Sequence, residues 1–262
     1  GSLFTVYDDS KLYTDADLIL PANMDVDIYS KGIVHVNTDA TIFGGVYLDD
    51  HSIFFVDDTL NINSLASIRN SRISVNSSKF EAQILSLVTS ASGTVITVTD
   101  KSDFIAEEGF TFTTTATTTT ARDIIDVDRN ANFSVYTSNM VWNNNGNATN
   151  ANLFAVRGNG SVFVETGLTT TLDQASNRLF NLVSPATVNV GSITSTMTDT
   201  VQGIQRNELR SGIQFSVGTD SASTIPLVTQ IDYASLPTSD PVLAGGLWRD
   251  SDAGNVIKVS RG

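Results

Sequence analysis

The chain has 262 residues and a net charge of −13, with 28 acidic side chains against 15 Lys and Arg. Nucleic acids and anionic membranes are bound through clustered basic residues, so this charge argues against both as partners. Hydrophobic residues make up 40% of the chain and charged residues 16%, which supports a packed core rather than disorder. There is no Cys and there are only two His, which excludes disulfides, thiolate chemistry and the usual zinc sites. No cofactor motif, signal peptide or apolar run long enough for membrane insertion is present.

The polar residues favour strands and turns. The chain contains 32 Thr, 29 Ser and 21 Asn. Thr favours strands, while Ser and Asn favour turns, and no long apolar pattern with helical spacing occurs. We therefore predict an all-β protein.

Residues 3–88 show apolar positions that recur every twenty residues and alternate locally as in strands. A strand pattern repeated at this period is typical of a β-solenoid, and we predict a right-handed parallel β-helix. Gly1-Ser2 has the form of a remnant of a cleaved tag, so the predicted shaft starts at residue 3. The columns are Val6/Val26/Val46/Ala66, Ile28/Leu48/Ile68/Val88, Ile33/Ile53/Ile73, Ile42/Ile62 and Leu60/Phe80.

The pattern loosens after residue 87. Leu87–Phe112 reads as a hairpin-like insertion with a turn at Ser92-Gly93, and a Thr-rich run follows, so we place an insertion near residues 87–120. From Ile124 the apolar clusters recur at steps of 21 to 26 residues, which predicts wider coils. The series are Val135/Val156/Phe180/Ile204 and Val164/Val190/Phe215, and the shaft is expected to span residues 3–217.

Residues 218–262 are expected to form a small C-terminal β tip or capping region. Trp248 would anchor a small core there, and Asp252-Ala253-Gly254-Asn255 would form a hairpin turn before the strand Val256–Val259. The segment Leu236–Trp248, followed by the strand at Val256, resembles the "LPTSDP…G.LW…G.V.VS" ending of many tailed-bacteriophage virion proteins. The Thr- and Asn-rich solenoid resembles in architecture the trimeric β-helix shafts of phage tailspikes.

These resemblances imply a phage virion protein, a tail fibre or tailspike fragment that binds host surface polysaccharide. Packing three copies would cover the open rung ends and a Thr-rich face, so the expected partners are two further copies of the chain, the polysaccharide and other virion proteins. The expected location is the virion tail. Two alternatives stay open, namely a catalytic tailspike that hydrolyses capsule or lipopolysaccharide, and a non-adsorbing baseplate or decoration protein.

Asp39, Asp57 and Asp58 are the residues to suspect if the chain is an enzyme. Asn37-Thr38-Asp39 and Asp57-Asp58 resemble two pieces of the polygalacturonase pattern, whose carboxylates would lie about 8 Å apart, as inverting hydrolysis needs. His51 precedes the pair instead of following it, and the basic clamp of the family is missing. Carboxylates of ordinary turns explain the same residues, and we expect no catalytic residue.

Two further segments carry candidate ligands. Asp126, Asp128 and Asn130 alternate as in calcium loops, but the following glycine and glutamate of such loops are missing, so no metal is expected. Val141–Asn152 is predicted as a protruding loop in which an exposed Trp142 would bind sugar with neighbouring amides. Those amides are Asn143, Asn144, Asn145 and Asn147. A buried Trp beside a polar turn is the alternative.

Overall fold

The structure of the chain, a computed structural model, divides into two compact units, Gly1–Val228 and Thr229–Gly262. The predicted boundary at residue 217 lies in the first unit, and residues 218–228 are outside the described part. The structure describes residues 2–21, 24–64, 73–90, 93–115, 122–144, 151–172, 178–183, 185–197, 204–206, 213–217, 238–239, 247–250 and 256–259.

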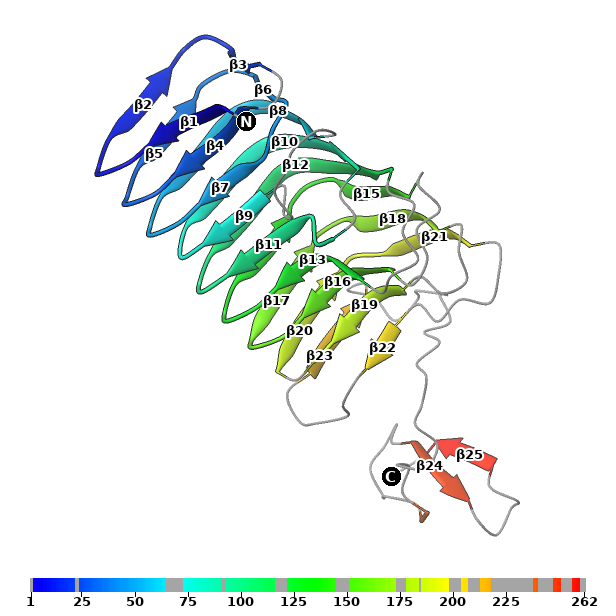
Figure 1. The fold of residues 1–262 in the computed structure, drawn as a ribbon. Helices are drawn as coiled ribbons and strands as arrows, with labels where there is room; N and C mark the ends of the chain where they lie inside the picture. The colour runs from blue at the N-terminus through cyan, green and yellow to red at the C-terminus, as the bar shows by residue number, and fades with distance from the viewer. Residues whose placement is uncertain are drawn as a thin grey trace. The chain divides into compact units, whose positions relative to one another are not determined.

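The first unit is built from two large sheets, and the first of them has nine strands. Neighbouring strands are parallel and come from successive coils of the chain (Figure 1). These strands are β1 (Ser2–Val6), β4 (Met24–Ile28), β7 (Val46–Leu48), β9 (Ile73–Asn76), β11 (Ile96–Thr99), β13 (Arg122–Val127), β16 (Ala151–Val156), β19 (Arg178–Leu182) and β22 (Ile204–Arg206).

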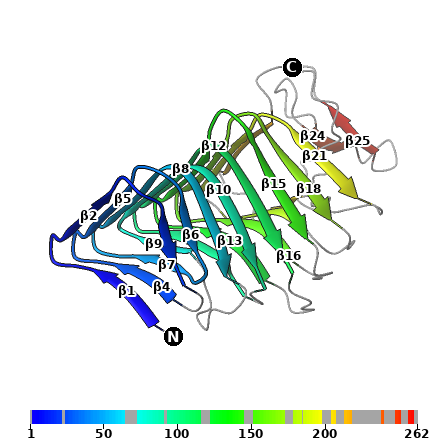
Figure 2. The same cartoon turned by 90° about the horizontal axis from the view of Figure 1, so that it is seen from above.

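The second sheet has fourteen strands in two rows, which we call the leading row and the trailing row. The leading row contains β2 (Lys11–Thr14), β5 (Ile33–Val36), β8 (Ile53–Ser64), β10 (Lys79–Thr89), β12 (Asp103–Thr114), β14 (Asn132–Val135), β17 (Gly160–Val164), β20 (Ala186–Val190) and β23 (Ile213–Val217). The trailing row contains β3 (Leu18–Leu20), β6 (Ala40–Ile42), β15 (Asn139–Asn144), β18 (Gly167–Leu172) and β21 (Ile193–Met197). The long strands β8, β10 and β12 belong to both rows, as Figure 2 shows.

Alternation of apolar and polar residues places the core between these three rows of strands. In the leading row, Phe54, Phe80, Phe104 and Phe133 all point inward and are completely buried. Their ring centroids follow one another at 5.6, 4.8 and 4.6 Å, because the parallel register places each ring above the previous one. The solenoid therefore has a continuous internal aromatic column.

The prediction of an all-β solenoid of parallel strands is confirmed, and the described residues include no helix. The predicted column of Ile33 and Ile53 forms, although both side chains point outward. Ile73 does not join it, since it pairs with Val46 in the first sheet. The right-handed coil, the trimer and the role of the tip stay predictions.

The fixed period and the insertion are corrected by the strand pairing. Within residues 3–88 Ile33 pairs with Ile53, a step of 20 residues, but Val46 pairs with Ile73, a step of 27. Residues added between strands lengthen the later coils without changing the ladder. The segment Leu87–Phe112 is no hairpin, because it contributes to β10, β11 and β12, which pair in parallel with their neighbours.

The second unit contains β24 (Leu247–Asp250) and β25 (Val256–Val259), which pair antiparallel. The predicted strand at Val256–Val259 is confirmed. The side chain of Trp248 and the turn at residues 252–255 lie outside the described residues.

Candidate functional site

The turns that lead from each first-sheet strand into the leading row form one continuous edge, which we call the corner. Backbone φ is positive there, for example 54° at Asp50 and 63° at His51. In this conformation the peptide groups of successive coils still form hydrogen bonds with one another. Lys31 N donates to Asp50 O at 2.9 Å, and His51 N donates to Ser77 O at 2.8 Å. The residues concerned are Asp8, Asp9, Ser30, Lys31, Asp50, His51, Ser77, Asp100, Lys101, Arg129, Asn130, Gly158 and Asn159.

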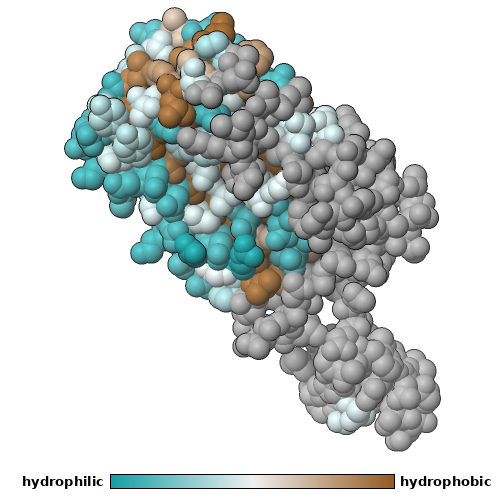
Figure 3. Space-filling view, in the orientation of Figure 1, coloured by the Kyte–Doolittle hydropathy of each residue, from teal (hydrophilic) through white to brown (hydrophobic). Residues whose placement is uncertain are grey.

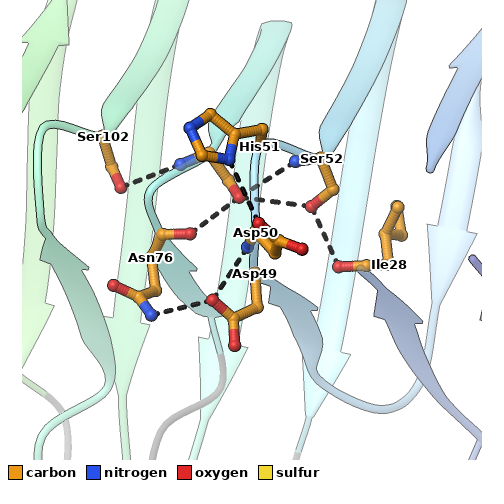
Figure 4. A network of polar contacts seen from close by, with 8 residues as sticks. Ile28, Asp49, Asp50, His51, Ser52, Asn76 and Ser102 are labelled. Carbon is orange, nitrogen blue, oxygen red and sulfur yellow. Dashed lines mark hydrogen bonds and ion pairs between the residues drawn. The ribbon is translucent and has the colours of Figure 1, made fainter. Parts of the chain in front are cut away.

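Buried serines fix the corner from the inside (Figure 4). Ser52 Oγ donates to Ile28 O at 2.9 Å and lies 3.2 Å from Ser78 Oγ. Ser78 Oγ donates to the carbonyl of Asn76 at 2.7 Å, and Ser78 N donates to Ser102 Oγ at 3.2 Å. The corner therefore has satisfied polar groups on its inner side and presents its charged side chains outward.

A depression of about 520 Å³ lies on the outer face of the first sheet beside the corner. Tyr29 and Tyr47 line it together with Asp27, Asp49 and Asn76, and we call it the tyrosine groove. Asp49 Oδ1 accepts hydrogen bonds from Asn76 Nδ2 and from the backbone N of Asp50, both at 2.8 Å (Figure 4). The carboxylate of Asp49, which lines the groove, is thus held in place by Asn76 of the next coil and by the backbone of its own turn.

Aromatic faces are available at one end of the tyrosine groove. Tyr29 is 40% exposed and stacks on Tyr7, which is 48% exposed, with centroids 5.6 Å apart and planes inclined by 11°. A ring face beside carboxylate and amide oxygens matches the apolar C–H faces and the hydroxyl groups of a sugar. These tyrosines were not among the predicted binding residues, although the 22-residue spacing of Tyr7 and Tyr29 is visible in the sequence.

A second depression of about 560 Å³ lies along the corner itself and is lined by His51, Ser77, Asp100, Lys101, Arg129 and Asn130. Two residues separate Val75 from Ser78, whereas three separate Leu48 from Ser52 and Val98 from Ser102. The shorter turn at Ser77 leaves the hollow between its longer neighbours. Arg129 Nη1 pairs there with Asp100 Oδ2 at 3.0 Å.

The three suspected catalytic carboxylates lie where the leading row meets the trailing row, away from the corner. Their side chains have structural partners. Asp57 Oδ2 lies 3.0 Å from His35 Nε2, and Asp39 Oδ1 accepts from Thr59 N at 3.0 Å. Asp58 Oδ1 accepts from the hydroxyl of Thr59 at 3.3 Å. The register aligns Asp57 with Asn37 and places Asp39 two positions further on.

The ring of His35 lies between two aromatic side chains on the outer face of the leading row. Its centroid is 5.8 Å from that of Tyr13 and 4.7 Å from that of Phe55. The neighbourhood of Asp57 is therefore aromatic on one side, a feature that the spacing of the carboxylates did not indicate.

The predicted sugar-binding loop is corrected in part. Trp142 is completely buried in β15 and its Nε1 donates to Thr114 Oγ1 at 3.3 Å, so its ring is not presented to a ligand. The alternative of a buried Trp holds, because Trp142 occupies an inward position of the trailing row. Asn143 and Asn144 lie in β15, and β16 begins at Ala151, so the predicted loop is shorter than Val141–Asn152. Asn145 and Asn147 lie outside the described residues.

Arg157 occupies the space between the suspected calcium ligands. Its Nη2 pairs with Asp126 Oδ2 at 2.5 Å and its Nε lies 3.5 Å from Asp128 Oδ2. Burial raises the pKa of Asp126 above its ordinary value, and the cation of Arg157 opposes this. Asn130 lies in the corner turn itself, next to Arg129. Within the described ranges no group of three or more His, Cys, Asp or Glu is placed to hold a metal ion.

Comparisons with known proteins give no relative: no family model, no curated protein and no solved structure matches the chain. Among the described residues there is also no helix long and apolar enough to cross a membrane.

Proposed function

We propose that this chain is a phage virion adsorption protein, part of a tail fibre or tailspike, that binds host surface polysaccharide in the tyrosine groove. The single observation that carries the binding part is the groove itself, in which two tyrosines, three carboxylates and one amide surround a volume of about 520 Å³. Ligand sites are concave, with aromatic walls and a few fixed polar groups.

The virion assignment rests on the C-terminal resemblance around Leu236–Trp248 and on the solenoid architecture. A slender coil of parallel strands suits a fibre, because every coil repeats the same surface and several copies can bind one polymer at once. A homotrimer would supply that multivalency, and its solution mass would be three times 28.0 kDa.

The proposal is tested by binding to a panel of capsular polysaccharides and lipopolysaccharides, measured by biolayer interferometry. Replacing Tyr29 by Ala removes a ring face on which a sugar can stack, and we expect the affinity to fall about 3- to 10-fold. Tyr13→Ala is the matched control, since Tyr13 is also an exposed tyrosine but lies on the other sheet. Equal binding by wild type and Tyr29→Ala contradicts the groove as the site.

The same panel separates the alternatives. Binding without release of reducing or unsaturated sugar ends supports adsorption, whereas release that is abolished in Asp57→Asn would make the chain a depolymerase. If neither cells nor glycans are bound, a non-adsorbing virion component is the better assignment.

A further inference from the structure

The depression of about 560 Å³ along the corner, which we call the corner hollow, meets the tyrosine groove at its rim. Asp50 lines the groove and the next residue, His51, lines the hollow. Asn76 and Ser77 are divided between groove and hollow in the same way on the next coil. Both volumes fall within the range of about 300–1,000 Å³ that is usual for ligand sites. A sugar polymer that enters the groove therefore has a second depression beside it.

The corner hollow lies where one turn of the corner is shorter than the turns on either side. The coil of Ser77 lies between the coils of His51 and Lys101, and the turns of those two coils are longer by one residue. The backbones at His51 and Lys101 are about 10 Å apart, because parallel strands of successive coils are spaced at about 4.8 Å. The side chains of these two residues thus flank a gap that the short turn leaves open.

The lining of the corner hollow is positively charged, in contrast to the chain as a whole. Lys101 and Arg129 carry permanent positive charges there against the one carboxylate of Asp100, while the whole chain has a net charge of −13. Lys101 is exposed, and it forms no ion pair within the described part of the chain. Figure 3 shows hydrophilic surface along the edge where these turns lie. A ligand group with a single negative charge is complementary to this lining.

Neighbouring carboxylates hold the basic side chains of the corner hollow in place. Arg129 Nη1 pairs with Asp100 Oδ2 at 3.0 Å, and Arg129 Nε lies 3.9 Å from Asp128 Oδ2. A guanidinium group has five N–H donors, so these contacts leave donors for a ligand. His51 Nδ1 lies 3.2 Å from Asp50 Oδ1, and the His51 side chain is 73% exposed. The hollow therefore combines oriented donors with the free ammonium group of Lys101.

We propose that the corner hollow binds the negatively charged group of an acidic polysaccharide, a carboxylate or a phosphodiester, while a neighbouring sugar of the same polymer occupies the tyrosine groove. Lys101 and Arg129 pair with the anion, and Ser77 and Asn130 bond to sugar hydroxyl groups. The three carboxylates of the groove repel an anion, so the charged group is directed to the hollow. A nucleic acid does not fit, because it requires a longer row of cations. This inference rests on the proposed glycan binding and adds the chemical class of the glycan.

The test compares charged and neutral forms of the same oligosaccharides by isothermal titration calorimetry with the full chain. Uronate-containing oligosaccharides from the polysaccharide panel are used as such and after reduction of their carboxyl groups to alcohols. Reduction should weaken binding at least about tenfold, because the ion pairs in the hollow are lost. Lys101→Gln should weaken binding of the charged form about 3- to 10-fold and leave binding of the reduced form unchanged.

Oligosaccharides that carry phosphodiesters and no carboxylate identify the source of the charge. If Lys101→Gln weakens the binding of these alone, the bound anion is a phosphodiester, and if it weakens the binding of uronates alone, the anion is a carboxylate. If Lys101→Gln affects neither class, the hollow is not an anion site and the proposal is wrong.

Two further variants separate the hollow from the groove. Lys11→Gln is the matched control, since it removes the same charge from an exposed lysine that lies on β2, away from the hollow, and it should leave binding unchanged. Tyr29→Ala should weaken binding of the charged and the reduced form equally, because it alters only the groove. Equal affinity of wild type for both forms, or an equal effect of Lys101→Gln and Lys11→Gln, overturns the inference and leaves the groove standing. If no oligosaccharide binds, the proposed function itself fails.

Discussion

Replacing Phe104 by Ala removes the centre of the internal aromatic column. Phe104 is completely buried, and its ring lies 4.8 Å from that of Phe80 and 4.6 Å from that of Phe133. Truncation of a buried Phe costs about 3–5 kcal/mol, and each stacked pair contributes about 0.5–1.5 kcal/mol beyond burial. Two such pairs are removed here, so the expected decrease in the free energy of unfolding lies in the upper part of that range, about 4–5 kcal/mol.

The measurement is urea denaturation followed by far-ultraviolet circular dichroism, with Phe55→Ala as control. Phe55 lies on the outer face of the same row and is half-buried, so its truncation should cost only about 1 kcal/mol. A Phe104→Ala variant whose free energy of unfolding lies within about 1 kcal/mol of that of Phe55→Ala would refute the reasoning that the inward column carries the stability of the middle coils.

Three further changes address the ladder contacts. Asn76→Asp sets a second carboxylate against Asp49 and should lower the free energy of unfolding by about 1–3 kcal/mol, measured in thermal melts near pH 7. For Asp126→Asn, the free energy of unfolding should increase relative to that of the wild type as the pH rises above 3.8. The reason is that the pKa of Asp126 is raised in the folded state, so its ionisation opposes folding. Urea titrations from about pH 3.5 to 7 measure this difference. Gly160→Ala should cost about 1–3 kcal/mol by calorimetry, since its Cβ would collide with the carbonyl of Val127.

The sequence predicts the class of fold because alternation and repetition are local properties. It does not predict the register throughout, since coils differ in length and only pairing reveals where residues were added. Val46 shows this: it pairs with Val26 twenty residues before it but with Ile73 twenty-seven residues after it. A fixed period necessarily fails at such a step, and the apparent insertion after residue 87 follows from the same shift.

The site was less accessible to sequence reasoning than the fold. The sequence positions of Asp39 and Asp57 suggested a catalytic role. In the structure, each of these carboxylates instead forms a hydrogen bond with a residue of a neighbouring coil. A usable signal was the recurring pair of polar residues before a small residue, as in Asp50-His51-Ser52 and Asp100-Lys101-Ser102, which marks successive coils at the corner. The tyrosine groove could be located only once this turn was aligned across coils.

The direction of the backbone ladder has a mechanical consequence. Hydrogen bonds between strands point from coil to coil, so a force that pulls the two ends apart loads them directly and one after another. A coil of 29 residues, the step from Asp103 to Asn132, would release about 95–105 Å of extended chain when it detaches. A pulled molecule would thus lengthen in unequal steps. The size of each step would report the number of residues in the coil that has detached.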